Sequence, residues 1–355
     1  EEMFKLRFPA DFVAEYIAQT RAWFYVMHVV STIVHGQAPF KNVVTTGNIR
    51  AEDGEKMSKS LRNFPDPNII IEKYGVDPLR FYLLTSPVMN GDDINFSEKG
   101  VADINRKVNL LVYNIWTFLR TYFQGKADEA MPTSTNILDV WVLAKLVDLN
   151  VQVSGNLDAY NTVKAGKVII EFINDLSTWY VRRSRDRMKQ EGADANLAFA
   201  VLAYALKELS KMLAPFMPYL ADFIYKDLTG KESVHLEQWS SLANLTVDPD
   251  VIGKMEIVRE IVSLGLSIRK EKSLPVRQPL AALAFDLNDS KINLPQEYYG
   301  SILSELNVKE ILPSLLDKNL RPEGTVVVAG GAIIKNFYLD INLTPELKHE
   351  GLARE

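Results

Sequence analysis

Cysteine is absent from this sequence of 355 residues, which excludes disulfide bonds and any zinc site built from cysteine ligands. The four histidines are scattered and do not have the spacing of metal ligands. The sequence also lacks a signal peptide and any run of about 18 apolar residues. It therefore predicts a cytoplasmic protein with no metal site of its own and no membrane span.

A strong charge of either sign is also missing. The chain has 40 Lys and Arg against 45 Asp and Glu, which gives a net charge of −5. No global basic field would attract a polyanion, so any nucleic-acid site must come from a local cluster of cations. Hydrophobic residues make up 47% of the chain, enough for a core, and the length predicts two or three domains.

Three kinds of pattern follow one another along the chain. Residues 1–98 mix strand and helix signals, residues 99–245 are helical, and residues 246–355 alternate again. We therefore expect an α/β domain, an all-α helix bundle and a small α/β module, in that order. The bundle helices are expected over residues 99–123, 137–157, 160–189 and 196–228, the last broken near Pro215 and Pro218.

The first region carries local signals. Apolar residues recur at helical spacing over residues 12–36, where Gly36 is placed to end the helix. The β-branched residues 42–51 predict a strand that ends near Gly47. Asp53 and Gly54 then predict a turn.

Two Asp-Pro pairs predict the starts of two short helices. Asp66 would cap the first helix with Pro67 in its first turn, and Gly75 lies just past its end. Asp77 and Pro78 repeat the device for the second helix, because an aspartate accepts the free N–H groups of a first turn.

The stretch KMSKS, residues 56–60, follows the predicted turn. Lys56 and Lys59 are flexible point charges, and the Ser58 hydroxyl can donate a hydrogen bond to a phosphate oxygen. Ammonium groups held beside a leaving pyrophosphate would stabilise the charge that develops during attack at an α-phosphate. The alternative is a solvated loop, because Lys and Ser are ordinary surface residues.

The context of this stretch resembles the class I aminoacyl-tRNA synthetases, for which KMSKS is the signature loop. The segment FPADFVAEYIAQTRAWFY is similar to the part of isoleucyl-tRNA synthetases that lines the aminoacyl-adenylate site. Further stretches of this chain resemble the same family, in the same order along the sequence. They are DPNIIIEKYGVDPLRFYLL, DLSTWYVRRSRDR, LAPFMPYLAD, SVHLEQW, LPVRQPL, ELNVKEI and LTPELKHEGLARE. The resemblance covers essentially the whole chain. The stretches QTRAWFY, VRQPL and ELNVKEI favour isoleucine over the valine and leucine enzymes.

The resemblance implies a fold and an activity. The fold would be the C-terminal part of a Rossmann-like catalytic domain, followed by an anticodon-binding bundle and a small module. The activity would be the ATP-dependent joining of isoleucine to tRNA(Ile) through an aminoacyl-adenylate, with Mg²⁺ accompanying the ATP. We expect a monomer.

The resemblance also implies residue roles. It gives Lys56 and Lys59 a catalytic role, and it places Lys56, Ser58 and Lys59 at the ATP phosphates. Glu15 and Gln19 match positions that bind the aminoacyl-adenylate. Ordinary surface residues are the alternative for these two.

Trp23 matches an aromatic wall of the isoleucine pocket, with a core residue of an amphipathic helix as its alternative. The segment also departs from the family pattern at three positions. Tyr16 and Ala22 stand where glycines are usual, and Ala18 stands where a carboxylate is expected near the ribose. These departures predict a different or weakened adenylate site.

Larger parts of the family pattern are missing. The chain has no HIGH tetrapeptide, no inserted editing domain and no cysteine-rich zinc tail. We therefore expect a fragment cut at both ends, without zinc and inactive alone. A stand-alone tRNA-binding module and a piece of a valine or leucine enzyme are the alternatives.

A cluster of arginines lies in the third expected bundle helix. On a helix Arg182, Arg185 and Lys189 share one face, and Arg183 and Arg187 share a neighbouring one. Clustered cations beside an aromatic ring suit RNA phosphates and unstacked bases, whereas a solvated face is the alternative. The predicted tRNA-binding residues are Trp179, Arg182, Arg183, Arg185, Arg187 and Lys189.

A second cluster of charge, residues 269–272 with Arg277, lies in the last module. It is interpreted as a charged helix end, and a contact with the RNA backbone is the alternative.

Overall fold

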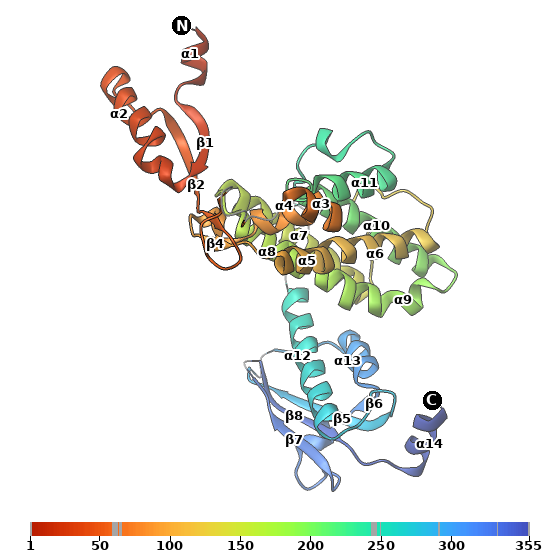
Figure 1. The fold of residues 1–355 in the computed structure, drawn as a ribbon. Coiled ribbons are helices and arrows are strands. Elements are labelled where there is room, and N and C mark those ends of the chain that lie inside the picture. Colours follow the sequence, from red (N-terminus) through yellow and green to blue (C-terminus); the bar gives the residue numbers. More distant parts are fainter. Residues whose placement is uncertain are drawn as a thin grey trace. The chain divides into compact units, whose positions relative to one another are not determined.

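The computed structural model describes residues 2–58, 63, 66–242, 247–248, 250–289, 292–331 and 333–353 (Figure 1). The chain divides into two compact units. The first contains Glu1–Ser134 and Lys145–Thr246, and the second contains Thr135–Ala144 and Val247–Glu355. The domain boundaries expected from the sequence, after residues 98 and 245, stay predictions.

The first unit begins with helix α1 (Glu2–Arg7) and a parallel pair of strands. Strand β1 (Ala10–Tyr16) pairs with β2 (Phe40–Thr46). The 3-10 helix η1 (Ile17–Arg21) and helix α2 (Trp23–His35) connect them, as parallel strands require a crossover connection. The unit therefore opens with a β-α-β arrangement (Figure 1).

The helix expected over residues 12–36 is wrong in its first part, because residues 12–16 belong to β1. Their backbone pairs with β2, and this non-local contact outweighs helical spacing. The end of the helix is confirmed, since Gly36 follows α2 in the left-handed conformation at φ 71°. The strand expected near residues 42–51 is confirmed as β2, which ends directly before Gly47.

Two short strands and two short helices follow. Strand β3 (Ile49–Arg50) pairs in parallel with β4 (Ile94–Asn95). Between them lie α3 (Pro67–Tyr74), α4 (Val76–Leu84) and the 3-10 helix η2 (Pro87–Asn90). The predicted cap of α3 is confirmed, because the Asp66 carboxylate accepts the Asn68 N–H at 2.9 Å.

The predicted cap of α4 is wrong. The helix begins at Val76, and Asp77 lies inside it. The Asp77 carboxylate instead accepts the backbone N–H groups of Tyr219 at 3.4 Å and Leu220 at 2.8 Å. These N–H groups belong to the first turn of another helix, so Asp77 caps a helix that is distant in the sequence.

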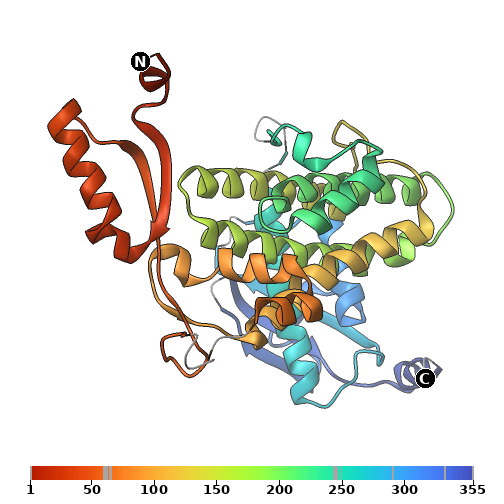
Figure 2. The same cartoon turned by 45° about the horizontal axis from the view of Figure 1, so that its top comes forward.

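The helix bundle expected from the sequence is confirmed (Figure 2). A π-helical turn, η3 (Asn105–Asn109), joins helix α5 (Glu98–Ile104) to helix α6 (Leu110–Tyr122). Another, η4 (Leu176–Val181), precedes helix α9 (Arg182–Met188). The break near Pro215 and Pro218 is present between the last two helices. The helices are α5 (Glu98–Ile104), α6 (Leu110–Tyr122), α7 (Ile137–Asp158), α8 (Thr162–Asp175), α9 (Arg182–Met188), α10 (Ala193–Leu213) and α11 (Pro218–Thr229).

Helix α4 is tied closely to this bundle. A Cβ atom built at Gly166 in α8 would lie 2.1 Å from Thr85 Cγ2, directly after α4, so only glycine permits this approach. Short 3-10 helix η5 (Val234–Leu236) follows α11. The buried apolar core of the bundle includes Val112, Ile115, Leu119, Ile169, Phe172, Ile173, Leu202, Leu206, Leu209 and Ile224.

The larger part of the second unit, from α12 onward, has the α/β character expected for the last module. Its strands lie in the order β6-β5-β8-β7, with β5 parallel to β6 and antiparallel to β8. Helices α12 (Asp250–Glu271) and α13 (Tyr299–Leu306) pack on it. The strands are β5 (Leu280–Leu287), β6 (Val308–Ile311), β7 (Thr325–Ala329) and β8 (Ile334–Asp340); short 3-10 helices η6 (Gln296–Tyr298) and η7 (Pro313–Leu316) and helix α14 (Pro345–Ala353) complete the unit.

Candidate functional site

The KMSKS stretch begins after a tight turn that follows β3. The Gly54 N–H donates to the Ala51 carbonyl, and the Ala51 N–H donates to the Glu55 carbonyl, each at 2.9 Å. Gly54 has φ 87°, a conformation that favours glycine. The predicted Asp53-Gly54 turn is therefore present, and Lys56 follows it directly.

Asn63 brackets the start of the stretch. Its Oδ1 accepts the Ser58 N–H at 2.9 Å, and its Nδ2 donates to the Lys56 carbonyl at 3.1 Å. The Met57 side chain packs against the buried cluster of Ile70, Phe96 and Val101. Met57 therefore points inward. The Lys56 side chain is exposed, and Ser58 is half-buried.

Lys59, the other predicted catalytic lysine, lies outside the described residues. Sequence reasoning missed Asn63 and Met57 as positioning residues. The methionine carries a weak signal, because an apolar side chain inside a polar stretch is often an anchor. No local pattern marks Asn63, whose partners are five and seven residues away.

The base of the loop is held by Asp93. Its Oδ1 accepts hydrogen bonds from the backbone and side-chain amides of Asn48 at 2.8 and 2.9 Å, and its Oδ2 pairs with Arg50. The Asn48 backbone N–H, the Asn48 side chain and the Arg50 guanidinium hold the pKa of Asp93 below its ordinary value. A Cβ at Gly47 would lie 1.9 Å from the Asp92 carbonyl oxygen, so glycine is required there.

The three predicted adenylate-binding residues lie along β1, η1 and α2. Glu15 is exposed on β1, where it pairs in register with Thr45. The Gln19 Oε1 accepts the Trp23 N–H at 3.1 Å, at the start of α2. Gln19 thus caps α2, and the Trp23 side chain is 44% exposed, so it is not the core residue of the alternative interpretation.

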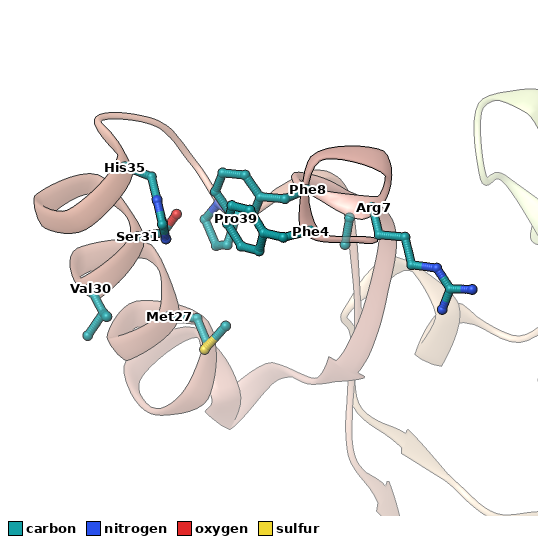
Figure 3. A pocket seen from close by; sticks show the side chains of 9 residues that line it. Phe4, Arg7, Phe8, Met27, Val30, Ser31, His35 and Pro39 are labelled. Atoms are coloured by element: carbon teal, nitrogen blue, oxygen red, sulfur yellow. The ribbon is translucent and has the colours of Figure 1, made fainter. Parts of the chain in front are cut away.

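A cavity of about 310 Å³ lies on α2 and its neighbours (Figure 3). The Phe4 and Phe8 rings stack at 4.6 Å between centroids, and each lies 4.9 Å from the His35 ring. Met27 and Val30 line the cavity from α2. None of the three predicted adenylate-binding residues lines it, so the sequence pattern and this cavity mark different places.

The predicted cationic face of α9 is formed. Arg182, Arg185 and Lys189 are all exposed. The Arg182 Nε donates to the Thr178 carbonyl at 2.8 Å, and the Arg185 guanidinium lies over the Phe118 ring at 5.4 Å. These contacts orient the stems of both arginines.

The other members of the cluster lie deeper. Trp179 is only 7% exposed, and the Arg183 guanidinium lies over its ring at 5.0 Å. Arg187 pairs with Asp194 at 3.2 Å, with 14% of its side chain exposed. Trp179, Arg183 and Arg187 therefore support the exposed face from below, and the Trp179 ring is not presented to solvent.

The charged cluster of the second unit, residues 269–272 with Arg277, also contains both a buried residue and exposed ones. Arg269 is buried, and its guanidinium donates to the carbonyls of Pro275, Gln278, Leu306 and Asn307. Burial lowers the pKa of the Arg269 guanidinium to about 10. Arg269 fixes the loop that follows α12, while Lys270, Lys272 and Arg277 are exposed.

Metal and membrane features were searched within the described ranges. In that part of the chain no group of three or more His, Asp or Glu side chains could hold a metal ion. None of the helices described there is long and apolar enough to cross a bilayer.

Two family models match parts of this chain. Residues 1–97, which include the KMSKS stretch, match the family model described as tRNA synthetases class I (I, L, M and V). Residues 139–284, which include the arginine cluster, match the anticodon-binding domain of tRNA ligase. The chain belongs to the class I aminoacyl-tRNA synthetases.

Its curated relatives include isoleucine–tRNA ligases. The enzyme of Protochlamydia amoebophila is 38% identical over 327 residues, covering 90% of this chain and 32% of the relative. The enzyme of Leifsonia xyli is 39% identical and covers 98% of this chain and 36% of the relative. The chain thus spans about a third of the length of these relatives.

Solved structures share the fold. Methionyl-tRNA synthetase of Mycobacterium tuberculosis bound by methionyl-adenylate matches 70% of this chain and half of its own, with a TM-score of 0.55 and 21% identity. The Agrobacterium radiobacter K84 LeuRS in complex with tRNA and LeuAMS matches 90% of this chain and 36% of its own, with a TM-score of 0.52 and 17% identity. The expected fold class is confirmed.

Proposed function

We propose that the chain is part of an isoleucine–tRNA ligase, which activates isoleucine with ATP and transfers it to tRNA(Ile). The observation that carries this proposal is the identity of 38–40% with isoleucine–tRNA ligases over most of the chain. The KMSKS loop and the cationic face of α9 support the proposal, because the loop would bind ATP and the face would bind tRNA.

The loop would bind the triphosphate of ATP. Asn63 and Met57 fix the backbone around Lys56 and Ser58, so the exposed ammonium of Lys56 is held on a defined anchor. Lys56 and Lys59 would stabilise the negative charge that develops on the leaving pyrophosphate. Ser58 would donate to a phosphate oxygen, and Mg²⁺ would enter with the phosphates of ATP.

The β1–α2 segment would hold the aminoacyl-adenylate. Glu15 would accept hydrogen bonds from the polar groups of the adenylate, and the exposed Trp23 ring would form a wall for the isoleucine side chain. Because the Gln19 Oε1 holds the first N–H of α2, the Gln19 amide is fixed and can donate to the adenylate.

The helical domain, residues 99–245, would bind the tRNA through Arg182, Arg185 and Lys189. Trp179, Arg183 and Arg187 would hold that face in shape. Residues 1–98 would form the C-terminal part of the catalytic domain and residues 246–355 the small module. We further propose that the enzyme acts as a monomer in the cytoplasm.

Isoleucine-dependent ATP–pyrophosphate exchange tests the activity. The assay uses the full-length polypeptide that contains this chain, with Lys56→Ala and Lys59→Ala as variants. We expect each to slow exchange by about 100-fold or more, the usual effect of removing a group that stabilises transition-state charge. Lys318→Ala, an exposed lysine of the second unit, is the matched control.

Three results would contradict the proposal. Unchanged exchange in both lysine variants would remove the phosphate role, and faster exchange with valine or leucine would reassign the amino acid. Tight tRNA binding without exchange in the full-length polypeptide would favour the non-catalytic tRNA-binding module.

A further inference from the structure

Three aromatic side chains are exposed around one hollow of the helix bundle. Tyr219 is 70% exposed, Phe223 46% and Tyr113 44%. The Phe223 ring stacks with the Tyr113 ring at 6.5 Å between centroids. We call Tyr113, Tyr219 and Phe223 the aromatic ledge. Exposed aromatic side chains that cluster in this way mark a candidate binding site.

The ledge lies between two hollows. One has a volume of about 440 Å³ and is lined by all three aromatic rings together with Asn109. The other has a volume of about 670 Å³ and shares Tyr219 and Phe223 with the first. Both volumes are within the range of about 300–1,000 Å³ that is usual for sites of small ligands.

The ledge is held rigidly from behind. The Asp77 carboxylate accepts the backbone N–H groups of Tyr219 and Leu220, which fixes the first turn of α11. The Trp116 ring packs edge-on against Phe223 at 4.8 Å, and its Nε1 donates to Asp227 at 2.8 Å. A rigid aromatic surface loses little conformational entropy when a ligand binds.

Cations line the second hollow. Arg80 and Lys226 face it, and Lys226 has half of its side chain exposed. Asp222 is the acidic residue that also lines it, and its carboxylate accepts hydrogen bonds from Ser233 and the Val234 N–H in addition to its ion pair with Lys226. Aromatic ring faces therefore lie directly beside positive charge.

We propose that the aromatic ledge binds an unstacked nucleotide of an RNA strand. The base would stack on the rings of Tyr219 and its neighbours, and the adjoining phosphate would lie beside Arg80 and Lys226. Single-stranded RNA is recognised by this combination of aromatic faces and cations. The naming of tRNA as the strand rests on the proposed function, to which the ledge adds a contact outside α9.

Asn109 adds hydrogen-bonding capacity to the aromatic hollow. Its amide carries both a donor and an acceptor, which suits the edge of a base. Lys226 pairs with Asp222 and Arg80 donates to the Pro215 carbonyl at 3.1 Å, and a nucleotide would add a phosphate beside both cations, which an apolar protein segment does not offer. The chemistry of both hollows therefore favours a nucleotide over a protein partner.

The test measures dissociation constants of the 355-residue chain for a tRNA(Ile) transcript and for a short oligoadenylate. The variants are Tyr219→Ala, Tyr219→Leu and Tyr219→Trp. We expect the Ala and Leu variants to weaken both RNAs by about tenfold or more, since one stacked base contributes about 1–3 kcal/mol. Tyr219→Trp keeps the ring face and should bind like the unchanged chain.

Tyr160→Ala is the matched control, because Tyr160 is 41% exposed between α7 and α8 and should not affect either RNA. Full affinity in Tyr219→Leu would show that the ring face does not bind RNA, and it would overturn the proposal. Displacement of the oligoadenylate by an equal concentration of AMP would assign the ledge to a free nucleotide and would equally overturn it.

The two proposals fail separately. If Arg182→Ala with Arg185→Ala weakens tRNA binding but the Tyr219 variants do not, the ledge proposal is wrong and the tRNA-binding face of α9 stands. If Tyr219 governs oligoadenylate binding while isoleucine-dependent exchange is absent from the full-length polypeptide, the ledge proposal stands and the ligase proposal is wrong.

Discussion

The carboxylate of Asp77 accepts the backbone N–H of Leu220 at 2.8 Å, although 143 positions separate the two residues. Asp77 lies in α4 and Leu220 in the first turn of α11. A side chain that local sequence assigns to one helix therefore caps another. The contact joins the α/β part of the first unit to its helix bundle and orients Tyr219 of the aromatic ledge.

Asp77→Ala should destabilise the first unit. The substitution leaves two N–H groups of α11 without their acceptor at a place where the residue is only 5% exposed. We expect the free energy of unfolding in urea to fall by about 1–2 kcal/mol, the usual effect of losing a buried cap. Asp158→Ala, an exposed aspartate at the end of α7, should change it by less than about 0.5 kcal/mol.

Asp77 should also make stability depend on pH. Burial raises the pKa of Asp77 above its ordinary value of 3.8, and the N–H groups of Leu220 and Tyr219 offset part of that shift. The folded state therefore binds a proton more readily than the unfolded state, so this contribution to stability falls as pH rises through the folded pKa.

The measurement compares the unchanged chain with Asp77→Asn, which cannot ionise. The difference in unfolding free energy between the two should decrease from about pH 3.8 upward and reach a plateau at neutral pH. A difference that stays constant over this range, or that increases with pH, would contradict the assignment.

The spacing of apolar residues predicted the bundle helices well. It failed for β1, whose conformation depends on pairing with a distant strand. Phe12 and Tyr16 are four residues apart and have helical spacing. The structure places both in β1, opposite Asn42 and Thr46 of a parallel strand. Nothing within residues 12–16 encodes that partner, whereas the bundle helices depend on i+3 and i+4 contacts that the sequence displays.

The predicted tRNA-binding residues also divide into those whose placement follows from local spacing and those whose placement depends on distant contacts. The common face of Arg182, Arg185 and Lys189 follows from spacing within one helix, and these three side chains are exposed. The burial of Trp179 depends on the π-helical turn that contains it and on the packing of α6 against that turn. Neither feature has a local signal, so an aromatic ring expected at the surface lies inside.

A buried ion pair in α10 offers a further test. The Lys207 ammonium pairs with the Glu208 carboxylate at 3.2 Å, and their side chains are 1% and 4% exposed. Lys207→Met should lower the free energy of unfolding by about 3–5 kcal/mol, because it removes a main partner of a buried carboxylate. The double variant with Glu208→Gln should lose less, since the buried carboxylate that Lys207 neutralises is removed as well and Lys211 keeps a neutral amide beside it.

A loss in the double variant equal to the sum of the losses in Lys207→Met and Glu208→Gln would show that the ion pair does not couple these residues. The coupling is the quantity to report, because the Glu208 carboxylate also contacts Lys211 and accepts a hydrogen bond from Ser240. Urea unfolding followed by helical circular dichroism measures the unchanged chain, both single variants and the double variant under the same conditions.

Asn63→Ala should impair the KMSKS loop without unfolding the protein. The variant loses the hydrogen bonds that join Asn63 to Ser58 and Lys56, so the backbone at Lys56 is no longer held in place. We expect isoleucine-dependent exchange by the full-length polypeptide to slow by about tenfold or more, because misplacing a catalytic group is costly. Asn319→Ala in the second unit is the control, and equal rates in the two variants would contradict a positioning role.

The cationic face of α9 predicts a specific salt dependence of tRNA binding. Each phosphate contact adds about 0.7–0.9 to the slope of log affinity against log salt, so Arg182→Ala with Arg185→Ala should reduce that slope by about 1.5. Lys164→Ala with Lys167→Ala removes two exposed cations from α8 and should leave the slope unchanged. Equal slopes in both double variants would show that the arginines of α9 form an ordinary solvated face. A smaller slope in the arginine variant alone would identify contact with phosphates, because removal of a base contact changes affinity without changing the slope.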